Sequence, residues 1–136
     1  MIKKLNLKFA IHTMLTLLAL VLCYHGLIMS GLISYQVAWG GRIETTSQMY
    51  AFEAVSILVN LLIMFLILLK ASYIKIKISI RVLNIFLWIV IGIFALNTIG
   101  NLLSTNFLEL IIFTPLTLMS AILCYRMVIE KNAINL

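Results

Sequence analysis

The chain has 136 residues, of which 64% are hydrophobic and 10% charged, and its formal net charge is +6 at pH 7. Soluble domains are nearer half apolar and a quarter charged, so this composition excludes an ordinary water-soluble fold and makes lipid the expected solvent. The basic residues stand in short segments at the ends of apolar runs, a pattern that argues against a nucleic-acid partner and predicts contact with anionic lipid headgroups on the cytoplasmic side.

Four apolar runs are long enough for helices that cross a bilayer. Such a helix needs roughly 20 residues to cross a hydrocarbon core about 30 Å thick. The runs lie at about 9–31, 49–69, 82–103 and 108–125. Their continuous apolar character is typical of helices and differs from the alternating pattern of a membrane β-barrel. We therefore predict an all-α fold, a four-helix bundle with antiparallel neighbours that forms a single transmembrane domain over residues 1–136.

Lysine and arginine predict the orientation of these helices. If the chain crosses four times, nine of its ten basic residues fall on one side: Lys3, Lys4, Lys8, Lys70, Lys75, Lys77, Arg81, Arg126 and Lys131. Positive charge concentrates on the cytoplasmic side of membrane proteins, so both termini are expected there, in a plasma or inner membrane. No A-x-A-like cleavage site follows the first run, which is therefore interpreted as an uncleaved helix and not as a secretory signal.

In the segment from Tyr73 to Arg81, every second residue is isoleucine and the residues between are polar, mostly basic. A period of two is typical of a half-buried strand, but a lone strand has no partner for its backbone. We therefore expect an interfacial connection whose isoleucines face the acyl chains while the cations stay at the headgroups. A docking strand for a cytoplasmic partner is the alternative.

Polar residues within the spans gather toward the outer side, opposite the nine cations. Glu53, Ser56 and Asn60 share one face of the second run. We define an outer polar cluster of candidate site residues at similar depth: His25, Arg42, Glu53, Asn97, Asn101 and Glu109. Because polar groups inside a span are costly, each needs a partner or a purpose.

Two interpretations of this outer polar cluster stay open. In the first, the polar groups satisfy one another: Arg42 pairs with Glu53 or Glu44, and the asparagines hydrogen-bond between helices. In the second, they surround a small outward-facing pocket in which Glu53 binds a proton or a cation. Trp39 begins the sequence WGGR and is expected either at the membrane interface or in a lid that brings Arg42 to Glu53.

Small or polar residues also follow one face of the first run and one of the fourth. They are His12, Thr16, Ala19, Cys23, Gly26 and Ser30 in the first, and Thr117, Ser120 and Cys124 in the fourth. Small residues let helices approach closely, so each face is expected to pack against a helix of the same chain or of a second copy in a homo-oligomer. Pro115 is expected to kink the fourth helix.

The sequence contains no recognisable nucleophile with an adjacent base, metal-ligand set or phosphate-binding loop. We therefore expect no catalytic, cofactor-binding or metal-binding residues, and a non-catalytic accessory, structural or interaction role. The alternative is a small proton- or cation-linked transporter that uses Glu53. The chain is similar to small multidrug transporters in size and helix number only, because Glu53 lies near the outer edge of its span. A membrane enzyme acting on lipid or quinone, with His25 and Glu53 as its acid–base pair, is less favoured.

Overall fold

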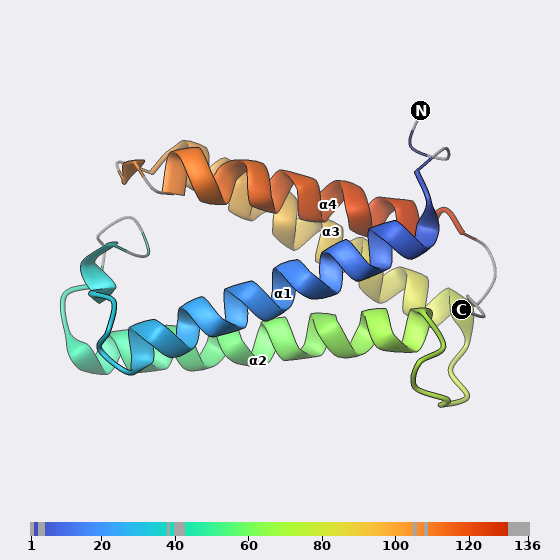
Figure 1. The fold of residues 1–136 in the computed structure, drawn as a ribbon, viewed down its shortest axis with the longest axis horizontal. Helices are drawn as coiled ribbons and strands as arrows, with labels where there is room; N and C mark the ends of the chain where they lie inside the picture. The colour runs from blue at the N-terminus through green and yellow to red at the C-terminus, as the bar shows by residue number, and fades with distance from the viewer. Residues whose placement is uncertain are drawn as a thin grey trace.

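The computed structural model describes residues 2, 5–37, 39, 43–104, 106–107 and 109–130. Its elements are α1 (Leu7–Met29), η2 (Tyr35–Val37), α2 (Thr46–Lys70), α3 (Ile80–Leu102), η4 (Glu109–Phe113) and α4 (Thr114–Val128), as Figure 1 shows. No strand occurs within the described ranges. Helices α1, α2, α3 and the continuous segment Glu109–Val128 are each long and apolar enough to cross a membrane. The predicted all-helical fold is confirmed for these residues, and it is consistent with a small multi-pass membrane protein.

Capping residues set where the first two helices begin. The Oδ1 atom of Asn6 accepts a hydrogen bond from the backbone N–H of Lys8 at 2.9 Å, so α1 begins two residues before the expected position. Thr45 and Gln48 form a capping box, in which each side chain bonds to the other residue's backbone N–H. Helix α2 therefore begins at Thr46, ahead of the apolar run itself.

Left-handed residues set where the same two helices end. Gly31 has φ = 78° just after α1, and Ser72 has φ = 60° just after α2. Beyond Ser72, the backbone N–H of Tyr73 bonds to the carbonyl oxygen of Leu68 at 3.0 Å, as in a Schellman motif. This turn stops α2 and directs the chain sideways into the loop before α3.

Pro115 is the second residue of α4 and does not lie inside a regular helix as the sequence suggested. The preceding segment η4 is wound as a π-helix, and the Thr114 hydroxyl donates to the Glu109 carbonyl at 3.2 Å. Proline is tolerated in the first turn of a helix because no N–H is needed there. The fourth span therefore changes its winding just before the proline.

The helices pack as two pairs, α1 with α2 and α3 with α4, and α1 also packs against α4 (Figure 1). Helices α2 and α3 touch each other less extensively. The main apolar core lies in the half of the bundle where α1 begins and α4 ends. Its largest fully buried members are Ile11, Met14, Ile67, Leu87 and Met127. Packing is thus tightest at one end of the molecule.

The described basic residues gather at one end of the bundle. All six basic residues that the structure describes lie at the end that holds this core, which we call the basic end: Lys8, Lys70, Lys75, Lys77, Arg81 and Arg126. The opposite end, which we call the acidic end, carries the carboxylates of Glu44, Glu53 and Glu109. Arg126 Nε donates to the Leu5 carbonyl at 2.8 Å, so the end of α4 meets the start of α1.

The two faces of small residues have different surroundings. Thr117, Ser120 and Cys124 of α4 are buried, so their predicted packing within the bundle is confirmed. All six residues of the corresponding face along α1 are exposed on the bundle surface: His12, Thr16, Ala19, Cys23, Gly26 and Ser30. Of the two open alternatives, packing of this face against a helix of the same chain is not seen, because α1 buries its larger apolar side chains instead. A second copy of the chain against this face stays a prediction.

Candidate functional site

The acidic end contains a buried carboxylate with a partner on each oxygen. His25, near the end of α1, places Nδ1 2.5 Å from Oε2 of Glu53, near the start of α2. The indole Nε1 of Trp39 donates to Oε1 of Glu53 at 3.0 Å. Glu53 is 0% exposed. The carboxylate is therefore held by two side chains that come from outside its own helix.

The conformation of the loop brings Trp39 to this position. Trp39 has φ = 57°, a left-handed backbone angle that turns the chain sharply. Its ring packs on Phe52 of α2, with ring centroids 5.1 Å apart. Since Phe52 precedes Glu53 directly, this contact fixes the indole N–H beside the carboxylate.

A cavity of about 700 Å³ adjoins this carboxylate, between the α1–α2 pair and the α3–α4 pair. Its lining includes five members of the outer polar cluster: His25, Glu53, Asn97, Asn101 and Glu109. The sixth, Arg42, lies outside the described residues, and so does its expected pairing with Glu53. Further polar residues line the cavity as well: Trp39, Ser56, Asn60, Ser104, Thr117 and Ser120. The structure thus brings together, around one space, residues that the sequence placed only at similar depth.

Some of these polar groups bond to each other across the bundle. The Thr98 hydroxyl of α3 donates to the Thr117 hydroxyl of α4 at 2.9 Å. Asn101 Nδ2 donates to the same Thr117 oxygen at 3.5 Å. Asn60 Nδ2 donates to the Ser56 carbonyl within its own helix at 2.9 Å. Hydrogen bonds between these side chains therefore satisfy polar groups on one wall of the cavity, and His25 and Trp39 satisfy Glu53.

Other polar groups face the cavity without such partners. Asn97 is exposed, and its side chain forms no hydrogen bond with a described residue. The hydroxyl of Ser56, which is partly buried, forms none either. Val55 of α2 is 59% exposed and Leu96 of α3 is 70% exposed where they line the cavity. Since α2 and α3 also pack sparsely, we infer that the cavity opens between these two helices, toward the surroundings of the bundle.

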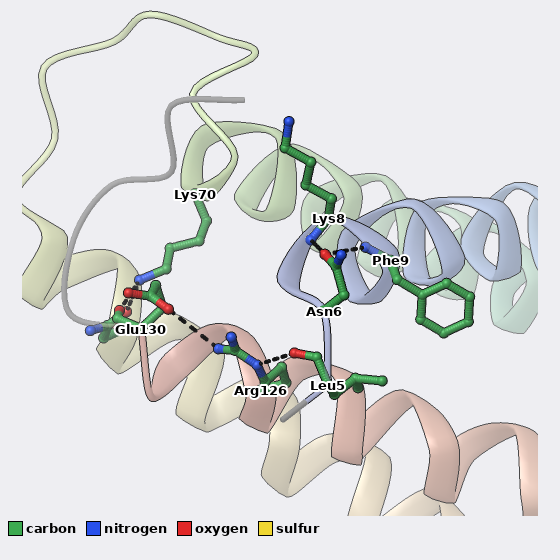
Figure 2. Close-up of polar contacts among 8 residues, drawn as sticks. Leu5, Asn6, Lys8, Phe9, Lys70, Arg126 and Glu130 are labelled. Carbon is green, nitrogen blue, oxygen red and sulfur yellow. Dashed lines mark hydrogen bonds and ion pairs between the residues drawn. The ribbon is translucent and has the colours of Figure 1, made fainter. Parts of the chain in front are cut away.

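A second buried polar centre lies at the basic end, as Figure 2 shows. Lys70 is 0% exposed, and its Nζ donates to Asn84 Oδ1 at 2.9 Å and to the Glu130 carbonyl at 2.8 Å. Arg126 Nη1 lies 3.4 Å from Oε2 of the same Glu130. This network joins α2, α3 and the end of α4. Two of the three ammonium protons of Lys70 have an acceptor in this network.

Sequence reasoning missed the roles of Trp39 and Lys70. Trp39 was expected at the membrane interface or in a lid that brings Arg42 to Glu53, and its own hydrogen bond to Glu53 was not expected. Lys70 was counted with the loop cations because it directly follows an apolar run. Asn84, one turn into α3, is the only sequence hint that a buried cation needs an acceptor at that depth.

The cavity and its polar wall are the features from which a role can be inferred. No protein-family model, curated protein or solved structure matches this chain. The chemistry of the site is therefore derived from its own residues.

Proposed function

We propose that this chain is a non-catalytic, four-span membrane protein with antiparallel neighbours that binds a small amphipathic molecule in the cavity at its acidic end. The observation that carries the proposal is the cavity of about 700 Å³, which is bordered by all four spans and contains amide and hydroxyl groups that bond to no described residue. Groups of this kind inside a membrane span are costly unless something binds them. A ligand that enters from the bilayer supplies the missing hydrogen bonds.

The distribution of charge supports an orientation for this protein. The six described cations at the basic end favour the cytoplasmic side for that end, and hence for both termini, in a plasma or inner membrane. In that orientation the cavity lies in the outer leaflet. Its opening between α2 and α3 then faces lipid, so the ligand is a molecule dissolved in the bilayer.

The accessible groups define the chemistry of the ligand. Glu53 is sealed behind His25 and Trp39, so we take Asn97 and Ser56, whose side chains bond to no described residue, as the main polar contacts of a ligand. An amide and a hydroxyl recognise an uncharged head that can both donate and accept hydrogen bonds. The apolar part of the lining, including Leu96, suits an alkyl or ring body. We infer a lipid-soluble alcohol, amide or acylglycerol.

A binding role agrees better with the His25–Glu53 pair than a catalytic one. A general base must reach the proton that it removes. Glu53 has no exposed surface, and His25 and Trp39 already occupy both of its oxygens. The pair therefore serves to hold α1, α2 and the loop in the shape that forms the cavity wall.

The proposal is tested by filling the cavity from one glycine. Gly100 lines the cavity, and a Cβ atom added there meets nothing within 4 Å. Gly100→Leu should therefore fill the space without disturbing α3. The probe is a diazirine-bearing octanol, photolysed with the purified protein in lipid nanodiscs and mapped by peptide mass spectrometry. We expect adducts around Ser56 and Asn97 in the wild type and a loss of at least about tenfold in Gly100→Leu.

Gly92 provides a matched control on the same helix. A Cβ atom at Gly92 also meets nothing within 4 Å, but this residue does not line the cavity. Gly92→Leu should therefore label like the wild type. Equal labelling of Gly92→Leu and Gly100→Leu, or adducts spread evenly over lipid-facing residues, would refute the binding site.

A proton- or cation-linked transporter is a second candidate, favoured by one observation. His25 and Glu53 form a titratable pair 2.5 Å apart inside the spans, directly beside the cavity. In this mechanism, a proton or cation would displace His25 from Glu53. Proteoliposomes with Glu53→Gln should then lose substrate-dependent proton uptake while the protein stays folded, and unchanged uptake would remove this candidate.

A further inference from the structure

The loop between α2 and α3, residues 71–79, lies beside the bundle at the basic end. It has no regular secondary structure from residue 75 to residue 79. In Figure 1 it extends sideways from the helix ends and does not prolong the helix axes. The Tyr73 hydroxyl hydrogen-bonds to Nε2 of His12 on α1 at 2.9 Å, which fixes the start of the loop. A loop that extends in this direction runs along a membrane surface.

The loop exposes cations and isoleucines together. Lys75 and Lys77 of the loop, and Arg81 at the start of α3, are exposed and form no ion pair with any described residue. Between them, Ile76 is 54% exposed and Ile78 is 39% exposed. Exposed isoleucines in a loop are unfavourable in water. Their alternation with cations suits a boundary between headgroups and acyl chains.

A hollow of about 470 Å³ lies between this loop and the adjacent helix ends. Tyr73, Ile74, Lys75, Ile78 and Leu83 are among the residues that line it. Most of its lining side chains are apolar and one ammonium group is at hand, while polar atoms make up about half of the wall. No carboxylate occurs between residues 71 and 83, so the positive charge at the hollow is not compensated within the loop.

We propose that residues 73–81 form a binding site for an anionic phospholipid. Lys75, Lys77 and Arg81 hold the phosphate and any further headgroup charge, and the hollow with its isoleucines takes the upper part of an acyl chain. Charge complementarity selects an anionic lipid over a zwitterionic one. The isoleucines select a lipid over a nucleic acid, which needs only the cations and gains nothing from apolar side chains. This site is independent of the cavity at the acidic end.

Lipid selectivity tests the role of the cations. The full chain is reconstituted in phosphatidylcholine vesicles with spin-labelled phosphatidylglycerol or spin-labelled phosphatidylcholine, and the ratio of the two association constants is measured by electron paramagnetic resonance. We expect the wild type to prefer phosphatidylglycerol. This preference should fall severalfold, up to about fivefold, in Lys75→Gln or Arg81→Gln. These side chains are exposed, so the substitutions leave the fold intact.

Lys8 provides a matched control, because it is an exposed cation at the basic end but outside the loop. Lys8→Gln should keep most of the preference. An equal loss in Lys8→Gln and Lys75→Gln would overturn the proposal in favour of a diffuse surface potential. Competition by soluble glycerol phosphate as strong as that by phosphatidylglycerol would also overturn it, because a free phosphate would then suffice.

The depth of the loop tests the role of the isoleucines. A nitroxide at Ile76→Cys, in a chain whose two native cysteines are replaced by serine, reports its accessibility to oxygen and to a water-soluble nickel chelate. We expect the nitroxide to lie below the phosphate level, and a nitroxide at Lys77→Cys to lie above it. Equal exposure of both positions to the aqueous reagent would overturn the proposed site.

Discussion

His25 and Glu53 are 28 residues apart in the chain, and their Nδ1 and Oε2 atoms are 2.5 Å apart in space. This contact joins the last turns of α1 to the first turns of α2. Trp39 completes it from the intervening loop, so three successive segments converge on one carboxylate. Because Glu53 has no contact with solvent, these two neighbours supply the hydrogen-bond partners of its oxygens.

Replacing Glu53 by leucine should destabilise the protein strongly. The change leaves the Trp39 indole and the His25 imidazole without their acceptor in a buried site. We expect the free energy of unfolding, measured by SDS titration in dodecyl maltoside micelles, to fall by about 3 to 5 kcal/mol. Glu53→Gln should lose less, because its amide still accepts from Trp39. The exposed Glu44→Leu is the control, and a loss for Glu53→Leu no larger than for this control would contradict the buried pair.

Replacing Trp39 by phenylalanine should loosen the loop. The ring can still pack on Phe52, but the hydrogen bond to the carboxylate is lost. We expect the free energy of unfolding to fall by about 1 to 2 kcal/mol and amide exchange in residues 32–37 to accelerate. Trp88 makes an edge contact with Tyr125 and no described hydrogen bond, so Trp88→Phe serves as the matched control. The idea fails if exchange in the loop is the same in both variants.

The Thr98–Thr117 hydrogen bond should show measurable coupling between α3 and α4. Each hydroxyl also bonds to a carbonyl four residues earlier in its own helix, so the threonine that remains in each single valine variant keeps a hydrogen-bond partner. A double-mutant cycle of Thr98→Val and Thr117→Val should give a coupling of about 0.5 to 1.5 kcal/mol. Thr16→Val on the exposed face of α1 should change stability little. Strict additivity of the two buried substitutions would argue against the interhelical bond.

The four spans could be predicted from the sequence because the length of an apolar run reflects the thickness of the bilayer. Their bounds could be predicted only to within a few residues. Thr45 and Gln48 extend α2 backward through a capping box, and the left-handed Ser72 fixes its end. Such bounds depend on backbone angles and side-chain hydrogen bonds, which hydrophobicity does not record.

The depth of the candidate site residues in the membrane could be predicted from the sequence, but not which of these residues contact one another. A rise of 1.5 Å per residue places His25, Glu53 and Asn97 at comparable levels once the crossings are known. Which of them meet depends on how each helix is rotated about its axis. Trp39 could not be placed because its reach depends on one left-handed loop residue, and Lys70 because a cation beside an apolar run looks the same whether it is buried or exposed.

Replacing Lys70 by methionine should destabilise the basic end. The methionine fills a similar volume, but the Asn84 side chain and the Glu130 carbonyl lose a charged donor. We expect the free energy of unfolding to fall by about 2 to 3 kcal/mol. Lys75→Met, an exposed lysine only five positions away, should have almost no effect in neutral micelles. Similar stability of the two variants would show that the buried network contributes nothing.

The two buried charges differ in when their partners are synthesised. Glu53 is compensated by His25 and Trp39, both of which leave the ribosome before it does. Lys70 depends on Asn84 and on a carbonyl 60 residues further along the chain. A nascent chain that has released only its first hairpin can therefore shield its carboxylate at once, while its lysine must remain at the water boundary until translation of α4 is finished.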